Sequence, residues 1–334
     1  MPWVGLDPFL FTVHHVDVYP AGNEAQGPAA SLNGRRLGAD FSYLDGWSMY
    51  HGADVPGFPQ HPHRGFETVT VVRRGLVDHS DSLGATARYG EGDVQWLTTG
   101  SGIMHAEMFP LVHPDRPNPM ELFQIWLNLP PNSKLVDPYF GMLWGEDIPT
   151  VIVGEGGVSV DVIAGSIEGH RAPSPPPDSW ASQGDSELAI WLIQMKEGAS
   201  WTLPASSPDA NRILYCFEGT DLRVSSTSIA NGVGVRLRPD VPTVIANGGG
   251  QGEFLMLQAR PIGAPVFQMG PFVMNTAEEI QAALLDYRRT QFGGWPWSRP
   301  DPVHDRTTGR FAIHADGRIE HRDLPQRLAT QSLR

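Results

Sequence analysis

The chain has 334 residues, of which 40% are hydrophobic and only 18% are charged, and this composition excludes a disordered protein. Its length predicts two domains of ordinary size. The net charge of -13 makes nucleic acids and anionic membrane surfaces poor partners, because both repel an acidic protein.

The first half of the chain has the pattern of a β protein. Short β-branched and aromatic runs, at residues 67–72, 92–97 and 123–129, alternate with clusters of Gly, Asp and Pro. The 37 glycines and 30 prolines of the chain fit such a turn-rich fold. The pattern predicts a sandwich or barrel.

A second set of strand signals follows, beginning with a hairpin whose expected turn is residues 155–157. Residues 172–178 (APSPPPD) then read as an exposed connector, because consecutive prolines cannot donate to a sheet. Further apolar runs at residues 188–195, 212–217 and 253–259 predict a second all-β unit.

One helix is expected near the end of the chain. Thr276 and Glu279 form a capping box ahead of the helical run at residues 280–292, and two glycines follow it. Residues 311–322 resemble a hairpin that turns on Asp316 and Gly317.

Cysteine usage and the N-terminus bear on the compartment. The only cysteine, Cys216, cannot form an internal disulfide, which is typical of a reducing compartment. The N-terminus has no basic region of a signal peptide, and no apolar stretch of about 18 residues occurs. We therefore expect a cytoplasmic protein that does not bind membranes.

Two pairs of potential metal ligands stand out. His61 and His63 are two residues apart, so a strand would place both on one face, and His105 and Glu107 repeat this spacing. Two such pairs on strands of one barrel can converge on a single ion. Three imidazoles and a carboxylate suit Fe, Mn, Ni, Cu or Zn rather than Ca or Mg.

The two halves are similar enough to test for duplication. Aligning residues 61–75 with residues 205–219 superposes a strand and the turn after it, but the second segment has no histidine at the matching positions. Any metal chemistry is therefore expected in the first half.

The stretches at residues 57–75 and 90–108 resemble the two metal-binding motifs of the cupin superfamily and, more narrowly, of the pirin family. The strings HPHRGFET, GDVQWLT and GIMHAEM carry this resemblance, and similar strings occur at residues 124–130 and 270–280. The sequence departs from the family pattern at residues 44–52, and its tail after residue 294 is longer than expected.

The resemblance implies an all-β bicupin, which is a pair of antiparallel β-barrels, with a C-terminal helix. The expected divisions are 1–150 for a metal-binding barrel, 151–292 for a metal-free barrel ending in the helix, and 293–334 for a C-terminal extension.

The ligands that the resemblance implies are His61, His63, His105 and Glu107, around one divalent transition metal. Iron(II) is the preferred ion, with Mn, Ni, Cu and Zn left open. General cupins would use the glutamate of the H-x-H-x-x-x-E pattern, which here is Glu67. We prefer Glu107 and expect Glu67 to support the site.

Some pirins resemble quercetin 2,3-dioxygenases, so a metal-dependent dioxygenase acting on flavonol-like, enediol-bearing substrates with dioxygen is the preferred function. Glu107 is the expected general base toward the flavonol 3-hydroxyl. The alternative is a metal- or redox-sensing regulator that binds a transcription factor or metabolic enzyme without turnover. A third hypothesis is a purely structural metal.

Overall fold

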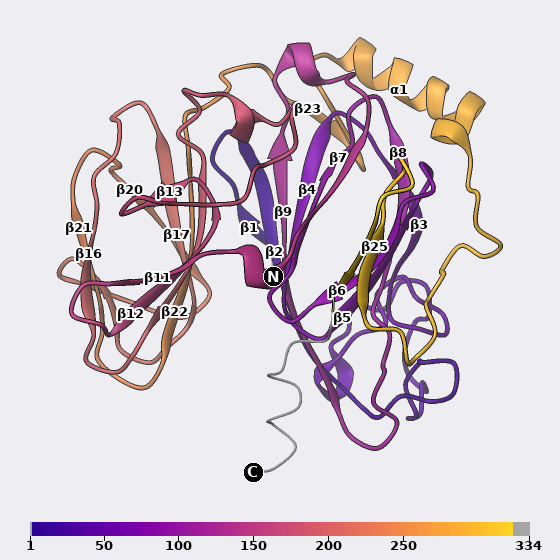
Figure 1. Cartoon of the computed structure of the whole chain (residues 1–334), viewed down its shortest axis with the longest axis horizontal. Helices are drawn as coiled ribbons and strands as arrows, with labels where there is room; N and C mark the ends of the chain where they lie inside the picture. Colours follow the sequence, from indigo (N-terminus) through magenta and orange to yellow (C-terminus); the bar gives the residue numbers. More distant parts are fainter. Residues whose placement is uncertain (1, 323–334) are drawn as a thin grey trace.

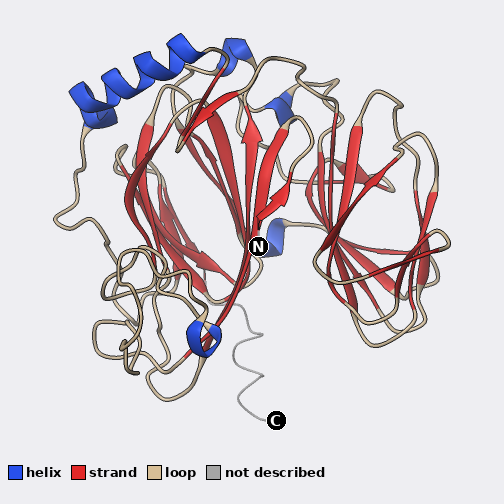
Figure 2. Cartoon of the chain, turned by 180° about the vertical axis from the view of Figure 1, so that it is seen from behind, coloured by secondary structure: helices blue, strands red, loops and turns tan. Residues whose placement is uncertain are grey.

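The computed structural model of the chain describes residues 2–322. These residues form two β-barrels that lie side by side, with one long helix at the edge of the first barrel (Figures 1 and 2). The prediction of an all-β protein with a C-terminal helix is confirmed. Within this range no helix has the length and apolar character needed to cross a membrane.

The first barrel consists of two six-stranded sheets. The first sheet has the order β1-β2-β9-β4-β7-β10, with β1 (Pro2–Val4), β2 (Phe9–Tyr19), β4 (Phe66–Arg74), β7 (Val94–Thr98), β9 (Asn118–Asn128) and β10 (Tyr139–Leu143). The second has the order β26-β25-β6-β5-β8-β3, with β3 (Gly57–His63), β5 (Leu76–Asp81), β6 (Thr86–Gly90), β8 (Ile103–Met108), β25 (Arg310–Ile313) and β26 (Ile319–Arg322).

The second barrel pairs a six-stranded sheet with a four-stranded sheet. The larger contains β11 (Thr150–Val153), β12 (Val158–Ala164), β15 (Ala189–Met195), β22 (Gly252–Ala259), β17 (Asn211–Glu218) and β20 (Val233–Leu237). The smaller contains β16 (Ser200–Leu203), β21 (Thr243–Asn247), β18 (Leu222–Val224) and β19 (Thr227–Ile229). The expected turn at residues 155–157 lies between β11 and β12, which pair as a hairpin.

Short elements complete the fold. Two small hairpins are β13 (Ser166–Ile167) with β14 (His170–Arg171), and β23 (Phe267–Met269) with β24 (Phe272–Met274). The 3-10 turns are η1 (Leu44–Gly46), η2 (Pro131–Ser133), η3 (Gly145–Asp147), η4 (Trp180–Ser182) and η5 (Gln291–Gly293). The long helix is α1 (Ala277–Thr290), whose N-terminus has the predicted capping box of Thr276 and Glu279.

The two barrels share an apolar interface. Val69 and Ile125 of the first barrel and Ile190 and Leu257 of the second belong to one buried cluster. The second barrel has its own interior cluster, which includes Cys216. The domain boundaries at residues 150 and 292 stay predictions.

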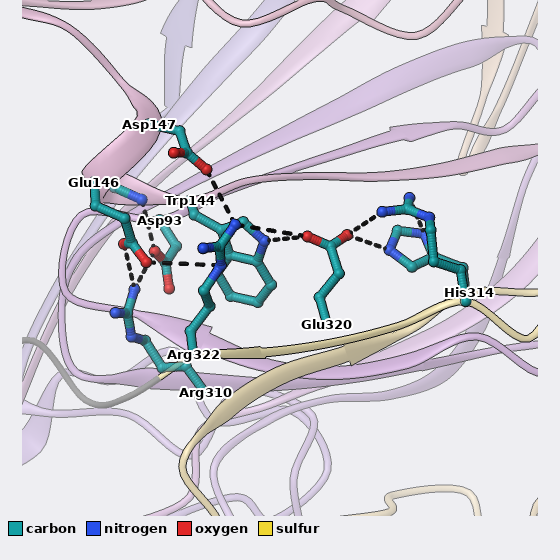
Figure 3. A network of polar contacts seen from close by, with 10 residues as sticks. Asp93, Trp144, Glu146, Asp147, Arg310, His314, Glu320 and Arg322 are labelled. Atoms are coloured by element: carbon teal, nitrogen blue, oxygen red, sulfur yellow. Dashed lines mark hydrogen bonds and ion pairs between the residues drawn. The ribbon is translucent and has the colours of Figure 1, made fainter.

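The C-terminal tail returns to the first barrel, where the yellow strands of Figure 1 lie beside β5 and β6. β25 and β26 form the hairpin that the turn at residues 316 and 317 predicts, and β25 extends the sheet by pairing with β6. Figure 3 shows the polar contacts that hold the hairpin. The Trp144 indole donates to Glu320 at 2.7 Å, and Arg310 donates to Asp93 at 2.7 Å.

Candidate metal centre

Three histidines from two neighbouring strands meet at one point of the first barrel. β3 carries His61 and His63, and β8 carries His105, which stands directly opposite His61 in the antiparallel register. Each histidine offers a ring nitrogen to a group whose atoms all lie within 4.8 Å of one another. The spacing of two residues places His61 and His63 on one face, and strand pairing brings His105 to it.

Glu107 lies at the edge of this group. Its Oε2 is 3.9 Å from Nε2 of His105. Thr70 donates to its Oε1 at 3.0 Å, and Gln124 donates to its Oε2 at 2.7 Å. The carboxylate is therefore close to the imidazoles and held by two donors, and its role as a fourth ligand stays a prediction.

Unsatisfied nitrogen atoms show that the group fits a cation. Nδ1 of His61 lies 2.9 Å from the Pro59 carbonyl, which can only accept, so Nδ1 donates and Nε2 keeps its lone pair. Nδ1 of His63 and both ring nitrogens of His105 are buried without a hydrogen-bond partner among residues 2–322. Buried polar atoms of this kind are costly, and a shared metal ion would satisfy one ring nitrogen of each histidine.

The protonation of the three imidazoles also suits a metal. Burial lowers the pKa of His61, His63 and His105 below the usual value for histidine. All three side chains are therefore neutral near pH 7, and neutral imidazole is the form that binds metals.

The structure places Glu67 away from the imidazoles. Its side chain is fully buried, and it accepts hydrogen bonds from Thr98 at 2.7 Å and from Ser179, just after the connector, at 2.6 Å. Burial raises the pKa of Glu67 to about 7. The connector is only partly exposed, since Ala172 and Pro176 within it are buried.

His79 is a further histidine near the group. Its ring centroid is 5.6 Å from that of His105. Nε2 of His79 lies 3.1 Å from the Asp81 carboxylate, and Nδ1 lies 3.3 Å from the Gln95 amide. These contacts occupy both ring nitrogens.

A cavity of about 1240 Å³ opens onto the histidines. His61 and His63 line it together with the aromatic rings of Phe58 and Trp126. Its remaining wall comes mainly from β2 and the loop ahead of β3, which contribute Phe11, Val13, His15, Phe41, Tyr43, Tyr50 and His51. Pro2, Trp3, His14, Phe217 and Gly232 extend it toward the second barrel.

Sequence reasoning missed the residues that support Glu107 and the loop that lines the cavity. Gln124 lies within a string that resembles the pirin family, but a glutamine in an apolar strand carries no specific chemical signal. Thr70 is one of two threonines of β4, and only its hydrogen bond across to β8 of the other sheet shows that it faces Glu107.

Two family models match this chain. The pirin model matches residues 23–127, and the model of the pirin C-terminal cupin domain matches residues 190–293. This chain belongs to the pirin family. The two matches and the two barrels confirm the expected bicupin fold.

Relatives of this pirin come from distant organisms. A pirin-like protein of Caulobacter vibrioides is 36% identical, over 75% of this chain and 87% of its own. Human pirin is 31% identical, over 73% of this chain and 80% of its own. A solved quercetin 2,3-dioxygenase from Acinetobacter baumannii is 27% identical and superposes with a TM-score of 0.69, covering 86% of each chain.

Proposed function

We propose that this pirin is a metal-dependent dioxygenase of flavonol-like substrates such as quercetin, with iron(II) as the metal. The observation that carries the proposal is the cavity of about 1240 Å³ whose aromatic wall reaches His61 and His63, two of the three clustered neutral imidazoles. The solved relative named quercetin 2,3-dioxygenase supports the same substrate class.

In this proposal His61, His63, His105 and Glu107 hold the ion. When bound, a divalent transition metal supplies Lewis acidity toward an acidic hydroxyl and one-electron chemistry toward dioxygen. The protein binds the substrate, orients it and accepts its proton.

The aromatic side chains of the cavity orient a flat substrate. Phe58 and Tyr50 are stacked, with their ring centroids 5.2 Å apart, and Trp126 lies 5.3 Å from the His63 ring. A fused aromatic ring system gains apolar burial and ring contacts between these walls. This places its hydroxyl-bearing edge toward the imidazoles.

Glu107 is the proposed general base. The hydrogen bonds from Thr70 and Gln124 hold its carboxylate, and Gln124 itself lines the cavity. Proton transfer requires the carboxylate oxygen to come within about 2.6–3.2 Å of the substrate hydroxyl.

The cavity favours turnover over the regulatory alternative, because a metal sensor needs no large aromatic cavity beside its ion. The regulatory role, a protein partner and a cytoplasmic location stay predictions. Protein pull-downs with ferrous and ferric protein test the regulatory role, which requires a partner whose recovery changes with the oxidation state.

The proposal is tested by incubating iron-loaded protein with quercetin in air while recording quercetin absorbance, oxygen uptake and carbon monoxide. We expect one dioxygen consumed and one carbon monoxide released per quercetin cleaved, the remaining atoms staying in the ring-opened product. Equal loss of absorbance without oxygen, or no loss in air, would contradict the proposal.

A further inference from the structure

We infer that His15 and His51 form a second recognition site in this cavity, which binds phenolic hydroxyl groups on the part of the substrate remote from the metal. This inference rests on the proposed function for the class of substrate. It predicts a preference for flavonols that carry hydroxyls on the ring farthest from the metal-binding edge.

The two histidines belong to the same cavity as the metal-site imidazoles. The Phe58 ring contacts His61 at a centroid distance of 6.4 Å, His15 at 5.9 Å and His51 at 5.7 Å. All four side chains line the cavity. A planar ligand that lies along Phe58 from the metal site therefore has His15 and His51 within its reach.

His15 has unused hydrogen-bonding capacity. It is 9% exposed and packs edge-on against Tyr50, with ring centroids 4.8 Å apart. No side-chain hydrogen bond of His15 occurs within residues 2–322. Burial lowers the pKa of His15 to about 3, so its ring is neutral and offers one acceptor and one donor.

The Gly38 carbonyl sets the tautomer of His51. Its Nδ1 lies 2.7 Å from the Gly38 carbonyl, and since that carbonyl can only accept, Nδ1 carries the proton. In the neutral ring Nε2 is then an acceptor. A phenol is a good donor to such a nitrogen, whereas a carboxylate has no proton to offer.

The loop that carries His51 is rigid. Asp40 and Tyr50 exchange two backbone hydrogen bonds of 2.8 Å that close the loop. The Asp40 carboxylate also accepts from Arg35 at 3.0 Å and from the Met49 amide at 2.9 Å. The Tyr50 hydroxyl donates to Asp17 at 2.7 Å. A preorganised acceptor loses little entropy when it binds.

Two acceptors that both pack against the Phe58 ring suit a substrate ring with adjacent hydroxyls, because each hydroxyl donates one hydrogen bond.

The experiment compares quercetin with galangin, which is the same flavonol without the two hydroxyls on its remote ring. Affinity is measured on the metal-loaded protein without oxygen, by quenching of tryptophan fluorescence. With two hydrogen bonds of ordinary strength, we expect quercetin to bind about 10- to 100-fold more tightly.

His15→Phe and His51→Phe keep an aromatic ring but remove the acceptor. Each is expected to lower the quercetin-to-galangin affinity ratio about 3- to 10-fold, mainly by weakening quercetin binding. His51 is exposed, so its variant tests the inference even if His15→Phe misfolds. His170→Phe, at an exposed strand of the second barrel, is the control and should leave the ratio unchanged.

An affinity ratio near one in the unmodified protein, or an unchanged ratio in His51→Phe, would overturn the inference. The result is separate from the test of turnover. A protein that discriminates between the two flavonols but consumes no oxygen with either would uphold the recognition site and contradict the proposed function.

Discussion

Glu67 and Glu107 show when residue spacing predicts the face on which a side chain lies and when it does not. Glu67 is four residues after His63, so both side chains would lie on the same face if they belonged to one continuous strand. The chain instead turns at Gly65, whose φ is +85°, so the faces of β3 and β4 are set independently. His61 and His63 lie within one strand, and so do His105 and Glu107. The sequence alone therefore predicts that the two members of each pair share a face.

The buried carboxyl of Glu67 predicts a pH-dependent stability. Its pKa is about 7 in the folded state, against about 4.5 when exposed, so the folded state binds more protons than the unfolded state between these values. Protonated Glu67 therefore makes its full contribution to the free energy of unfolding below pH 4.5, and this contribution decreases as the pH rises to 7.

Glu67→Gln removes this titration. We expect the free energy of unfolding of the variant, relative to the unmodified protein, to rise by up to about 3 kcal/mol between pH 4.5 and pH 7 and to stay level above pH 7. Urea unfolding at several pH values measures the difference. A difference that does not change with pH would contradict a raised pKa.

At the scale of elements, local signals predicted the helix and the two hairpins because caps and turns act over a few residues. The pairing of β25 with β6 was not predictable in this way. It joins residues more than two hundred positions apart, and nothing in either short strand specifies its neighbour.

Arg88 connects the tail to the barrel. Its guanidinium is fully buried, pairs with Asp78 through bonds of 2.7 and 2.8 Å, and donates to the backbone carbonyls of Asp305 and Thr308 at 2.8 and 3.0 Å. These bonds tie β5 and β6 to the segment that leads into β25.

Arg88→Met is expected to lower the free energy of unfolding by about 3–5 kcal/mol, because it leaves Asp78 buried without its partner. It should also make the tail more sensitive to limited trypsin digestion. Arg318→Met, at the exposed hairpin turn, is the matched control and is expected to cost less than about 1 kcal/mol. Equal losses in the two variants would show that Arg88 does not hold the tail.

Gly102 fixes the start of β8, the strand that carries His105. Its φ is +129°, and a Cβ built there would lie 2.6 Å from the Phe292 ring. A larger residue therefore forces both a strained backbone and a shift of the ring that packs beside β8.

Gly102→Ala is expected to lower the free energy of unfolding by about 2–4 kcal/mol. Gly84→Ala is the control for backbone strain alone. Gly84 has a φ of +86°, and a Cβ added there would meet no atom within 4 Å. This variant should therefore lower the free energy of unfolding by only about 1–2 kcal/mol. Thermal and urea unfolding of the two variants measure the difference. A smaller loss for Gly102→Ala than for Gly84→Ala would contradict the contact with Phe292.

At the scale of the whole molecule, the two barrels have different interiors. The first gathers three imidazoles beside a cavity, whereas the second is filled by an apolar cluster around Leu214 and Met256. The absence of histidines from residues 205–219, which match residues 61–75, predicted this asymmetry. The cavity was not predictable, because strands from distant parts of the chain enclose it.

The barrels are also joined by charge. Arg73 of the first barrel pairs with Glu121 of the same barrel and with Glu253 of the second. This contact lies beside Phe217, which the Arg73 guanidinium covers at 4.9 Å and which lines the cavity. The second barrel therefore contributes to the site by shaping one end of the cavity.

The most direct test of this account is the metal content of protein purified without chelators, measured by elemental analysis for His63→Ala, His105→Ala and the control His170→Ala. We predict about one transition metal ion per chain in the unmodified protein and the control, and less than about a tenth of that in the first two variants. Full metal content in His63→Ala and His105→Ala would contradict the account.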